Sequence, residues 1–173
     1  MSLNTRLMKG LSPADVWSVL SDGETYGYWV VGTRAVREVI GDWPTPGSAL
    51  HYVVGHLAAR KDDVTTSVAS DPGRRLRLEV RAWPVGTLHV EIQLHPSPAG
   101  TTVVIEEAPN KGLLKTLHNP LVDLAIKARN VETLRRLEKQ ARQLTEQSRP
   151  SARTAVSGRE ASEAPPARAL PAR

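Results

Sequence analysis

Residues 111–144 read KGLLKTLHNPLVDLAIKARNVETLRRLEKQARQL and carry the only long helical pattern in the sequence. Asn119 followed by Pro120 is typical of a helix start, with Asn as the N-cap and Pro in the first turn. From Pro120 to Leu144 no glycine and no further proline interrupts the pattern. The stretch therefore predicts one helix of about 25 residues, roughly 37 Å long.

The first half of this helix is apolar on two sides. One stripe ends near the middle and consists of Leu114, Leu117, Leu121, Leu124, Ala125, Ala128 and Val131. The other stripe continues to the end and consists of Val122, Ile126, Leu134, Leu137, Ala141 and Leu144. A helix that is apolar on both sides is usually buried on both sides. We therefore expect the first half to be sandwiched, with one side toward a ligand cavity, a loop or a partner chain, and the second half to pack one face on a sheet. Asn130 lies on the stripe of Ile126 and Leu137, so its amide is expected to be buried and to need hydrogen bonds.

Short elements precede the long helix. Ser12-Pro13-Ala14-Asp15 predicts a helix start, and residues 25–29 predict a second short helix. After a first strand at residues 5–9, strand-like segments recur about every 12 residues between turns that contain Pro and Gly: 33–40, 48–57, 63–70, 74–83, 86–95 and 101–108. Several of them alternate apolar and polar residues, which is typical of a sheet with one covered face. The long helix is the expected cover, because the two early helices are too short to span the sheet.

Composition limits the class of protein. A length of 173 residues fits one domain. The net charge of +5 is spread over the chain without a basic patch interleaved with aromatics, so we expect no nucleic-acid partner. No cysteine is present, which excludes disulfides and thiolate chemistry. No apolar run reaches the length of a membrane span or a signal peptide, so no integral membrane segment and a cytoplasmic location are expected. Residues 146–173 are rich in Pro, Ala, Arg and Ser and predict a disordered tail behind a folded domain of residues 1–145.

The order of predicted elements and several short motifs resemble one superfamily. Residues 13–22 (PADVWSVLSD), 43–48 (WPTPGS), 100–103 (GTTV), 119–121 (NPL) and 129–134 (RNVETL) are similar to its sequence motifs. The chain resembles the START-like, birch-pollen-allergen superfamily, and within it bacterial SRPBCC proteins of the polyketide cyclase/dehydrase and lipid transport type. The resemblance implies an α+β helix-grip fold, in which an antiparallel sheet of about seven strands (β-α-α-β6-α) curves around the C-terminal helix.

The same resemblance implies a hydrophobic cavity between the sheet and the long helix. The residues that it places in the lining are Leu76, Leu78, Val80, Leu88, Val90, Ile92, Val122, Ile126 and Asn130, with Trp29, Tyr52 and Trp83 at the mouth. Because the chain contains no Phe, the lining should consist mainly of Leu, Val and Ile.

No motif for nucleophilic catalysis or phosphate binding occurs in the chain. His51 and His56 have opposite parity on a strand, and His89 and His95 share the polar parity, so neither pair predicts a metal site. We expect no metal and no cofactor. Enzymes of the superfamily use a few polar residues in an apolar cavity, and His56 and Glu107 are the catalytic candidates here, with Glu38, Arg34 and Asn130 as further polar residues. If Glu107 faces inward, it needs a partner such as Arg34 or Arg129; the alternative is an exposed Glu107 at a strand end and a solvated or structurally bonded His56.

Three functions follow from different observations. In the first, the chain is expected to bind a small hydrophobic molecule, such as a lipid, an isoprenoid or a polyketide-like compound. Alternatively, it is a cyclase or dehydratase that acts on such a molecule by general acid–base chemistry. As a third possibility, it is a protein-interaction module that uses the stripe of Leu117, Leu121, Leu124 and Val131. The sequence leaves open whether the protein is a monomer or a homodimer.

Overall fold

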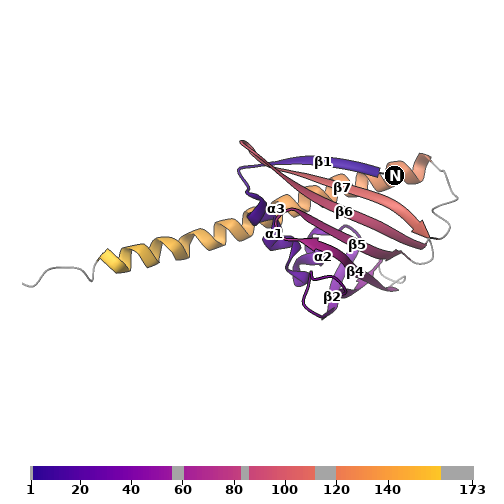
Figure 1. The fold of residues 1–173 in the computed structure, drawn as a ribbon, viewed down its shortest axis with the longest axis horizontal. Helices are drawn as coiled ribbons and strands as arrows, with labels where there is room; N and C mark the ends of the chain where they lie inside the picture. Colours follow the sequence, from indigo (N-terminus) through magenta and orange to yellow (C-terminus); the bar gives the residue numbers. More distant parts are fainter. Residues whose placement is uncertain (1, 56–60, 83–85, 112–119, 161–173) are drawn as a thin grey trace, which may run out of the picture.

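The computed structural model describes residues 2–55, 61–82, 86–111 and 120–160. In the described residues, seven antiparallel strands form one sheet with the order β1-β7-β6-β5-β4-β3-β2, and the helices lie on one face of it (Figure 1). The strands are β1 Ser2–Lys9, β2 Thr33–Ile40, β3 Ala49–Val54, β4 Lys61–Asp71, β5 Arg75–Ala82, β6 Gly86–Ser97 and β7 Gly100–Lys111. The helices are α1 Pro13–Leu20, η1 Gly23–Thr25, α2 Tyr26–Trp29 and α3 Pro120–Glu160. This arrangement confirms the predicted helix-grip fold.

The first helix starts where its sequence motif predicts. The Ser12 side chain accepts a hydrogen bond from the backbone N–H of Asp15 at 3.2 Å, and the Asp15 carboxylate accepts one from the backbone N–H of Ser12 at 2.7 Å. This reciprocal capping satisfies N–H groups that a helix start otherwise leaves unpaired. Val16, Val19 and Leu20 then turn one apolar face of α1 into the core.

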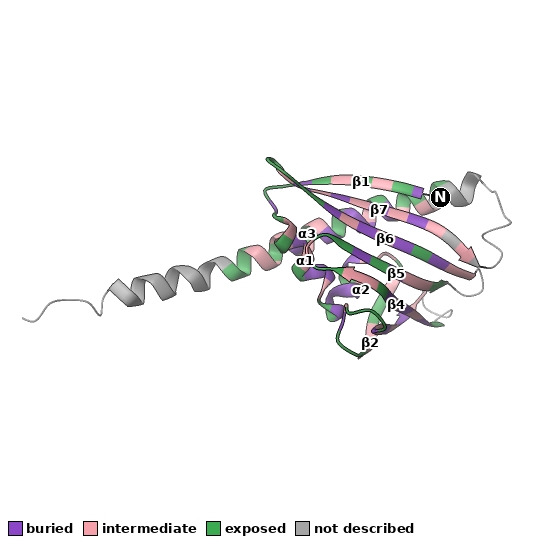
Figure 2. Ribbon diagram, viewed as in Figure 1, coloured by how far each residue is buried: buried purple, intermediate pink, exposed green. Residues whose placement is uncertain are grey.

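The sheet shows the predicted alternation. Leu76 and Leu78 are buried on β5 while Arg77 between them is exposed, and the pattern recurs on β6 (Figure 2). Since successive side chains of a strand point to opposite faces, one face of the sheet becomes apolar. Strand residues supply half of the buried core cluster, and the helices and connections supply the other half.

The second half of α3 packs on this face as expected. Leu134, Leu137 and Ala141 are at most 1% exposed, and Leu144 packs at the edge of the core. The expectation that α3 alone covers the sheet was incomplete. Tyr26 and Trp29 from α2, together with the buried residues of α1, belong to the same core. Each short helix covers only one part of the sheet, and both pack against α3 as well.

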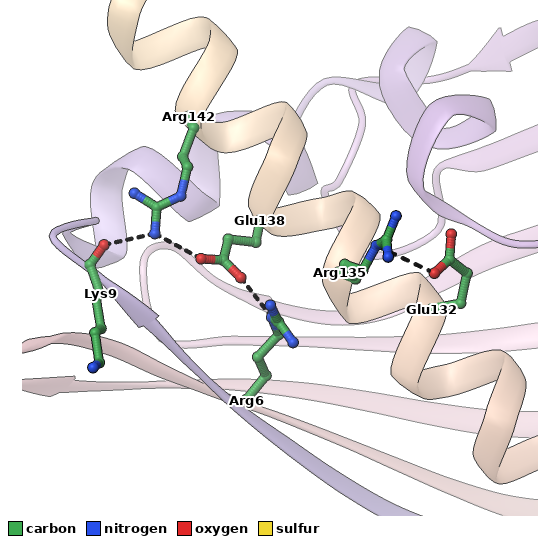
Figure 3. Close-up of polar contacts among 6 residues, drawn as sticks. All are labelled: Arg6, Lys9, Glu132, Arg135, Glu138 and Arg142. Atoms are coloured by element: carbon green, nitrogen blue, oxygen red, sulfur yellow. Dashed lines mark hydrogen bonds and ion pairs between the residues drawn. The ribbon is translucent and has the colours of Figure 1, made fainter.

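Charged side chains fix α3 to the first strand (Figure 3). Glu138 on α3 accepts hydrogen bonds from Arg6 Nε at 2.5 Å and from Arg142 at 2.6 Å, and Arg142 also donates to the backbone carbonyl of Lys9 at 2.9 Å. Burial alone would raise the pKa of Glu138, but the hydrogen bonds from Arg142 and Arg6 outweigh it and lower that pKa. The contacts hold the helix in register over β1.

Two features of α3 differ from the sequence expectation. The helix continues to Glu160, so residues 146–160 are helical where a disordered tail was expected; residues 161–173 lie outside the described residues. Leu124 and Val131 are 63% and 55% exposed, which corrects the expectation that their stripe is sandwiched. The sheet covers one side of the helix only, and no second layer lies over these two residues in the described part of the chain. The side chains of Leu114, Leu117, Leu121 and Ala125 lie outside the described residues.

Candidate functional site

A cavity of about 340 Å³ lies between the apolar face of the sheet, α2 and α3. This volume is at the lower end of the range for small-molecule sites, which is about 300–1,000 Å³. Six strands, β2 to β7, and two helices, α2 and α3, contribute residues to its wall. The lining residues are Tyr26, Trp29, Val30, Val31, Gly32, Thr33, Tyr52, Val54, Gly55, Asp63, Leu78, Val80, Arg81, Leu88, Val90, Ile105, Glu107, Arg129, Asn130 and Thr133.

The structure brings together many of the residues proposed from the sequence. Those that line the cavity are Trp29, Tyr52, Leu78, Val80, Leu88, Val90 and Asn130. Trp29 and Tyr52 are only 2% and 3% exposed, so they belong to the inner wall and not to the mouth where they were expected. Trp83, His56 and the side chain of Val122 lie outside the described residues.

Three expected lining residues, Leu76, Ile92 and Ile126, do not line the cavity. Ile92 is 1% exposed and lies opposite Leu76 in the register of β5 and β6. Ile92 and Leu76 belong to the same buried core cluster as Leu134 and Leu137 of α3, and neither lines the cavity. Ile126 on α3 is half-buried but is not among the described residues of the cavity wall.

An ion pair inside the cavity joins β7 to α3. Glu107 is 5% exposed, because it follows Val103 and Ile105 on the inward face of β7. Its Oε1 accepts a hydrogen bond from the guanidinium of Arg129. The expectation that Glu107 sits at an exposed strand end was wrong, since β7 continues to Lys111. Of the two partners considered, Arg129 is the one that pairs, while Arg34 and Glu38 are exposed on β2.

Polar atoms without partners gather around the same cavity. Among the described residues, five buried side-chain atoms make no hydrogen bond: Trp29 Nε1, Thr33 Oγ1, Glu107 Oε2, Arg129 Nε and Asn130 Nδ2. All five belong to residues that line the cavity. A buried polar atom normally has a partner, so this clustering makes these five atoms the polar part of the cavity wall that is available to a ligand.

A cluster of hydroxyl groups lies at another part of the wall. The hydroxyls of Tyr26 and Tyr52 lie 3.0 and 2.9 Å from Thr65 Oγ1, and all three residues are buried. Burial raises the pKa of Tyr26 and of Tyr52. The Tyr26 ring also packs edge-on against Trp29, with centroids 5.2 Å apart. Both tyrosine hydroxyls therefore keep their protons at neutral pH and are held in the cavity wall by Thr65.

Asp63 and Arg81 add a second pair of charges to the lining. Asp63 is 7% exposed, and burial raises the pKa of its carboxyl although the Val64 backbone N–H and Arg81 lower it. Asp63 lies on β4 and Glu107 on β7, three strand spacings apart. The apolar side chains of β5 and β6 lie between the two carboxyl groups.

Sequence reasoning missed part of this wall. Asp63 shares its strand parity with Thr65 and Ser67, and such a polar run does not predict an inward face. Tyr26 belongs to a short helix, and residues 30–33 follow that helix. Neither segment has an apolar periodicity that would predict an inward face. A signal for Tyr26 existed, because an aromatic residue three positions before Trp29 places both rings on one face of a helix.

The described residues contain no group of three or more His, Asp or Glu side chains arranged to hold a metal ion. No helix in the described ranges is both long and apolar enough to cross a membrane. The chemistry available in the cavity is therefore that of carboxylates, a guanidinium, hydroxyls, an amide and an indole in an apolar wall.

A family model matches most of the chain, and several solved structures share its fold. Residues 5–142 match the family model described as polyketide cyclase/dehydrase and lipid transport. A search of curated proteins gives no match. A protein from Nitrosomonas europaea is 19% identical, with a TM-score of 0.66 over 83% of this chain and 95% of that one. A Staphylococcus aureus protein of unknown function is 9% identical, with a TM-score of 0.65 over 83% and 94%. Ara h 8.0201 is 10% identical, with a TM-score of 0.65 over 80% and 95%. At these identities the structural likeness shows the fold alone.

Proposed function

The chain belongs to the polyketide cyclase/dehydrase and lipid transport family, and we propose that it binds a small hydrophobic molecule between the sheet and α3. The observation that carries this proposal is the cavity wall. Leu78, Val80, Leu88, Val90 and Ile105 form a continuous apolar surface on adjacent strands. Such a surface with a few convergent polar groups is the usual composition of a ligand site.

The volume and the lining of the cavity limit the size and the chemistry of the ligand. A volume of 340 Å³ corresponds to about eleven water molecules at ~30 Å³ each, which is enough for a compact lipid, isoprenoid or polyketide-like molecule. The apolar part of the ligand would lie on β5 and β6, and aromatic packing would come from Tyr26, Trp29 and Tyr52.

A neutral fluorescent dye such as Nile red tests the binding role by titration. The change Val90→Phe places a larger side chain in the cavity, and overpacking of about 1–3 kcal/mol predicts an affinity loss of about 5- to 150-fold. Val68→Phe is the matched control, because Val68 is 47% exposed on β4. Equal saturable binding by both variants would show that the dye sits elsewhere, and no saturable binding by the wild type would contradict the proposal.

A second candidate function is general acid–base catalysis on the bound molecule, as in a cyclase or dehydratase. The observation that favours it is the Glu107 carboxylate, whose Oε2 is unpaired in an apolar cavity while Arg129 holds Oε1. A carboxylate in this position can accept a proton from carbon or oxygen of a bound β-dicarbonyl compound.

Hydrogen–deuterium exchange tests this second function without knowledge of the natural substrate. A bound base accelerates exchange at the acidic carbon between two carbonyl groups, and NMR follows the loss of that proton signal. We expect the wild type to accelerate exchange of a hydrophobic β-diketone and Glu107→Gln to lose the acceleration. An exchange rate equal to that of buffer for the wild type would remove Glu107 as a base.

The third function considered from the sequence, protein interaction through the helix stripe, is favoured by the exposure of Leu124 and Val131. Size-exclusion chromatography with light scattering tests it as self-association. A dimer that becomes a monomer in a Leu124→Asp, Val131→Asp double variant would support it, and a monomeric wild type would count against self-association through this stripe.

A further inference from the structure

The unpaired atoms of the cavity point to the chemistry of the ligand's polar end. Trp29 Nε1, Asn130 Nδ2 and Arg129 Nε are hydrogen-bond donors, while Glu107 Oε2 is an acceptor. The hydroxyl of Thr33 can act as either. Trp29, Asn130 and Glu107 are at least 95% buried, so water does not solvate these atoms. A group that both accepts and donates hydrogen bonds would satisfy atoms of both kinds at once.

The charges of the lining disfavour a ligand that carries a carboxylate. The charged residues in the described wall are Glu107, Arg129, Asp63 and Arg81, which sum to zero. Arg129 is already paired with Glu107, and Arg81 acts on Asp63. A ligand carboxylate would therefore enter beside Glu107 without a free cation to neutralise it. An unpaired charge in an apolar environment is far more costly than a neutral hydroxyl.

On the basis of the proposed binding function, we propose that this cavity selects a neutral, hydroxyl-bearing hydrophobic molecule and discriminates against the corresponding carboxylate. The hydroxyl donates a hydrogen bond to Glu107 Oε2 and accepts one from Asn130 Nδ2 or Trp29 Nε1. Arg129 acts as a positioning residue, since it holds the other carboxylate oxygen of Glu107 and keeps Oε2 available. The apolar chain of the ligand extends over Val90 and Leu78 toward β4.

A matched pair of ten-carbon probes tests this selectivity. Decan-1-ol and decanoate are titrated by competition with Nile red at pH 8, where decanoate is ionised. We expect the wild-type protein to bind the alcohol about tenfold or more tightly than the carboxylate, because only the carboxylate opposes the charge of Glu107. This affinity ratio is measured on the wild-type protein alone, so the test remains valid even if a substituted variant does not fold.

The change Glu107→Gln assigns the selectivity to one residue. It removes the negative charge and frees Arg129, so the ratio should reverse in favour of decanoate. Glu106→Gln is the control: it makes the same change at the neighbouring residue, which faces the opposite side of β7, and should leave the ratio unchanged. Thermal melting of each variant establishes that it is folded.

The possible outcomes separate the two proposals. Alcohol preference in the wild type that reverses in Glu107→Gln supports the inference. Equal or tighter binding of decanoate by the wild type overturns the inference and leaves the binding function in place. An unchanged ratio in Glu107→Gln also overturns it. Displacement of Nile red by neither probe would contradict the inference, and failure of Nile red itself to bind would contradict the binding function.

Discussion

Replacement of Asn130 by Leu should stabilise the free protein and weaken ligand binding. Asn130 is 1% exposed, and its Nδ2 has no hydrogen-bond partner. A buried polar group without a partner costs about 1–3 kcal/mol, and Leu removes this cost while keeping the branch at Cγ. The adjacent cavity accommodates the difference in shape. We therefore expect Asn130→Leu to unfold at a temperature higher by about 2–4 °C for each kcal/mol gained.

Thermal unfolding of the ligand-free protein, followed by circular dichroism, measures the gain. Thr133→Val is the matched control on the same face of α3, because it also replaces a buried polar residue by an apolar one. Thr133 Oγ1 accepts a hydrogen bond from the backbone N–H of Val31 at 3.4 Å. The loss of this bond should destabilise the protein by about 1 kcal/mol. The two variants are thus expected to shift the melting temperature in opposite directions.

Decan-1-ol titration gives the second half of the same test. The loss of one neutral hydrogen bond, about 0.5–1.5 kcal/mol, should weaken binding of the alcohol by about 2- to 10-fold in Asn130→Leu. A lower melting temperature for Asn130→Leu would refute the reasoning, because it would mean that the amide has a structural partner. Stabilisation without any loss of affinity would show that Asn130 does not contact the ligand.

Three further outcomes concern the fold. Leu137→Ala should destabilise the protein by about 2–5 kcal/mol in chemical denaturation, since Leu137 is 0% exposed. Leu124→Ala is the control on the same helix. Because Leu124 is 63% exposed, this change should alter stability by less than about 0.5 kcal/mol. Glu138→Gln should lower the free energy of unfolding by about 1–2 kcal/mol at neutral pH. Burial raises the pKa of Glu138, but the hydrogen bonds from Arg142 and Arg6 outweigh burial and lower it. The stabilisation is therefore present above the unfolded-state pKa of about 4.3 and is lost as the pH falls through the folded-state pKa. Gly100→Ala should destabilise the β6–β7 turn, because a Cβ atom would lie 2.3 Å from the carbonyl oxygen of Met8 and the φ of Gly100 is +142°; a reduced melting temperature checks it.

Each of these outcomes has a contradicting result. Equal costs for Leu137→Ala and Leu124→Ala would contradict the assignment of the two faces of α3. A stability difference between wild type and Glu138→Gln that grows toward acidic pH would have the wrong sign for a lowered pKa. An unchanged melting temperature for Gly100→Ala would mean that β1 can move away from the turn.

Much of the fold could be predicted because its signals are local. The capping sequence at Ser12 and Asp15 determines the start of α1, and the turn residues between alternating segments separate β4, β5, β6 and β7. The apolar stripe of Leu134, Leu137 and Ala141 predicted which face of α3 packs on the sheet. In each case a few neighbouring residues carry the whole signal.

The errors arose where the outcome depends on residues distant in the sequence. Ile92 and Val90 have the same strand parity, but only Val90 lines the cavity, while Ile92 belongs to the buried core cluster with Leu134 and Leu137 of α3. The exposure of Leu124 depends on the absence of a second layer over α3 in the described residues, and helical periodicity does not report it. Tyr26 and Asp63 join the same wall because α2 lies beside β4, where Tyr26 hydrogen-bonds to Thr65.

The Trp29 indole offers the most direct test that the cavity binds a ligand through its polar atoms. Trp29 Nε1 lines the cavity without a hydrogen-bond partner, whereas Trp43 Nε1 donates to the backbone carbonyl of Leu20 at 3.0 Å and is not part of the cavity wall. In a ¹H–¹⁵N correlation spectrum, saturation with decan-1-ol should shift the Trp29 indole signal and leave that of Trp43 in place. A bound state in which the Trp29 signal does not move would contradict ligand binding in this cavity.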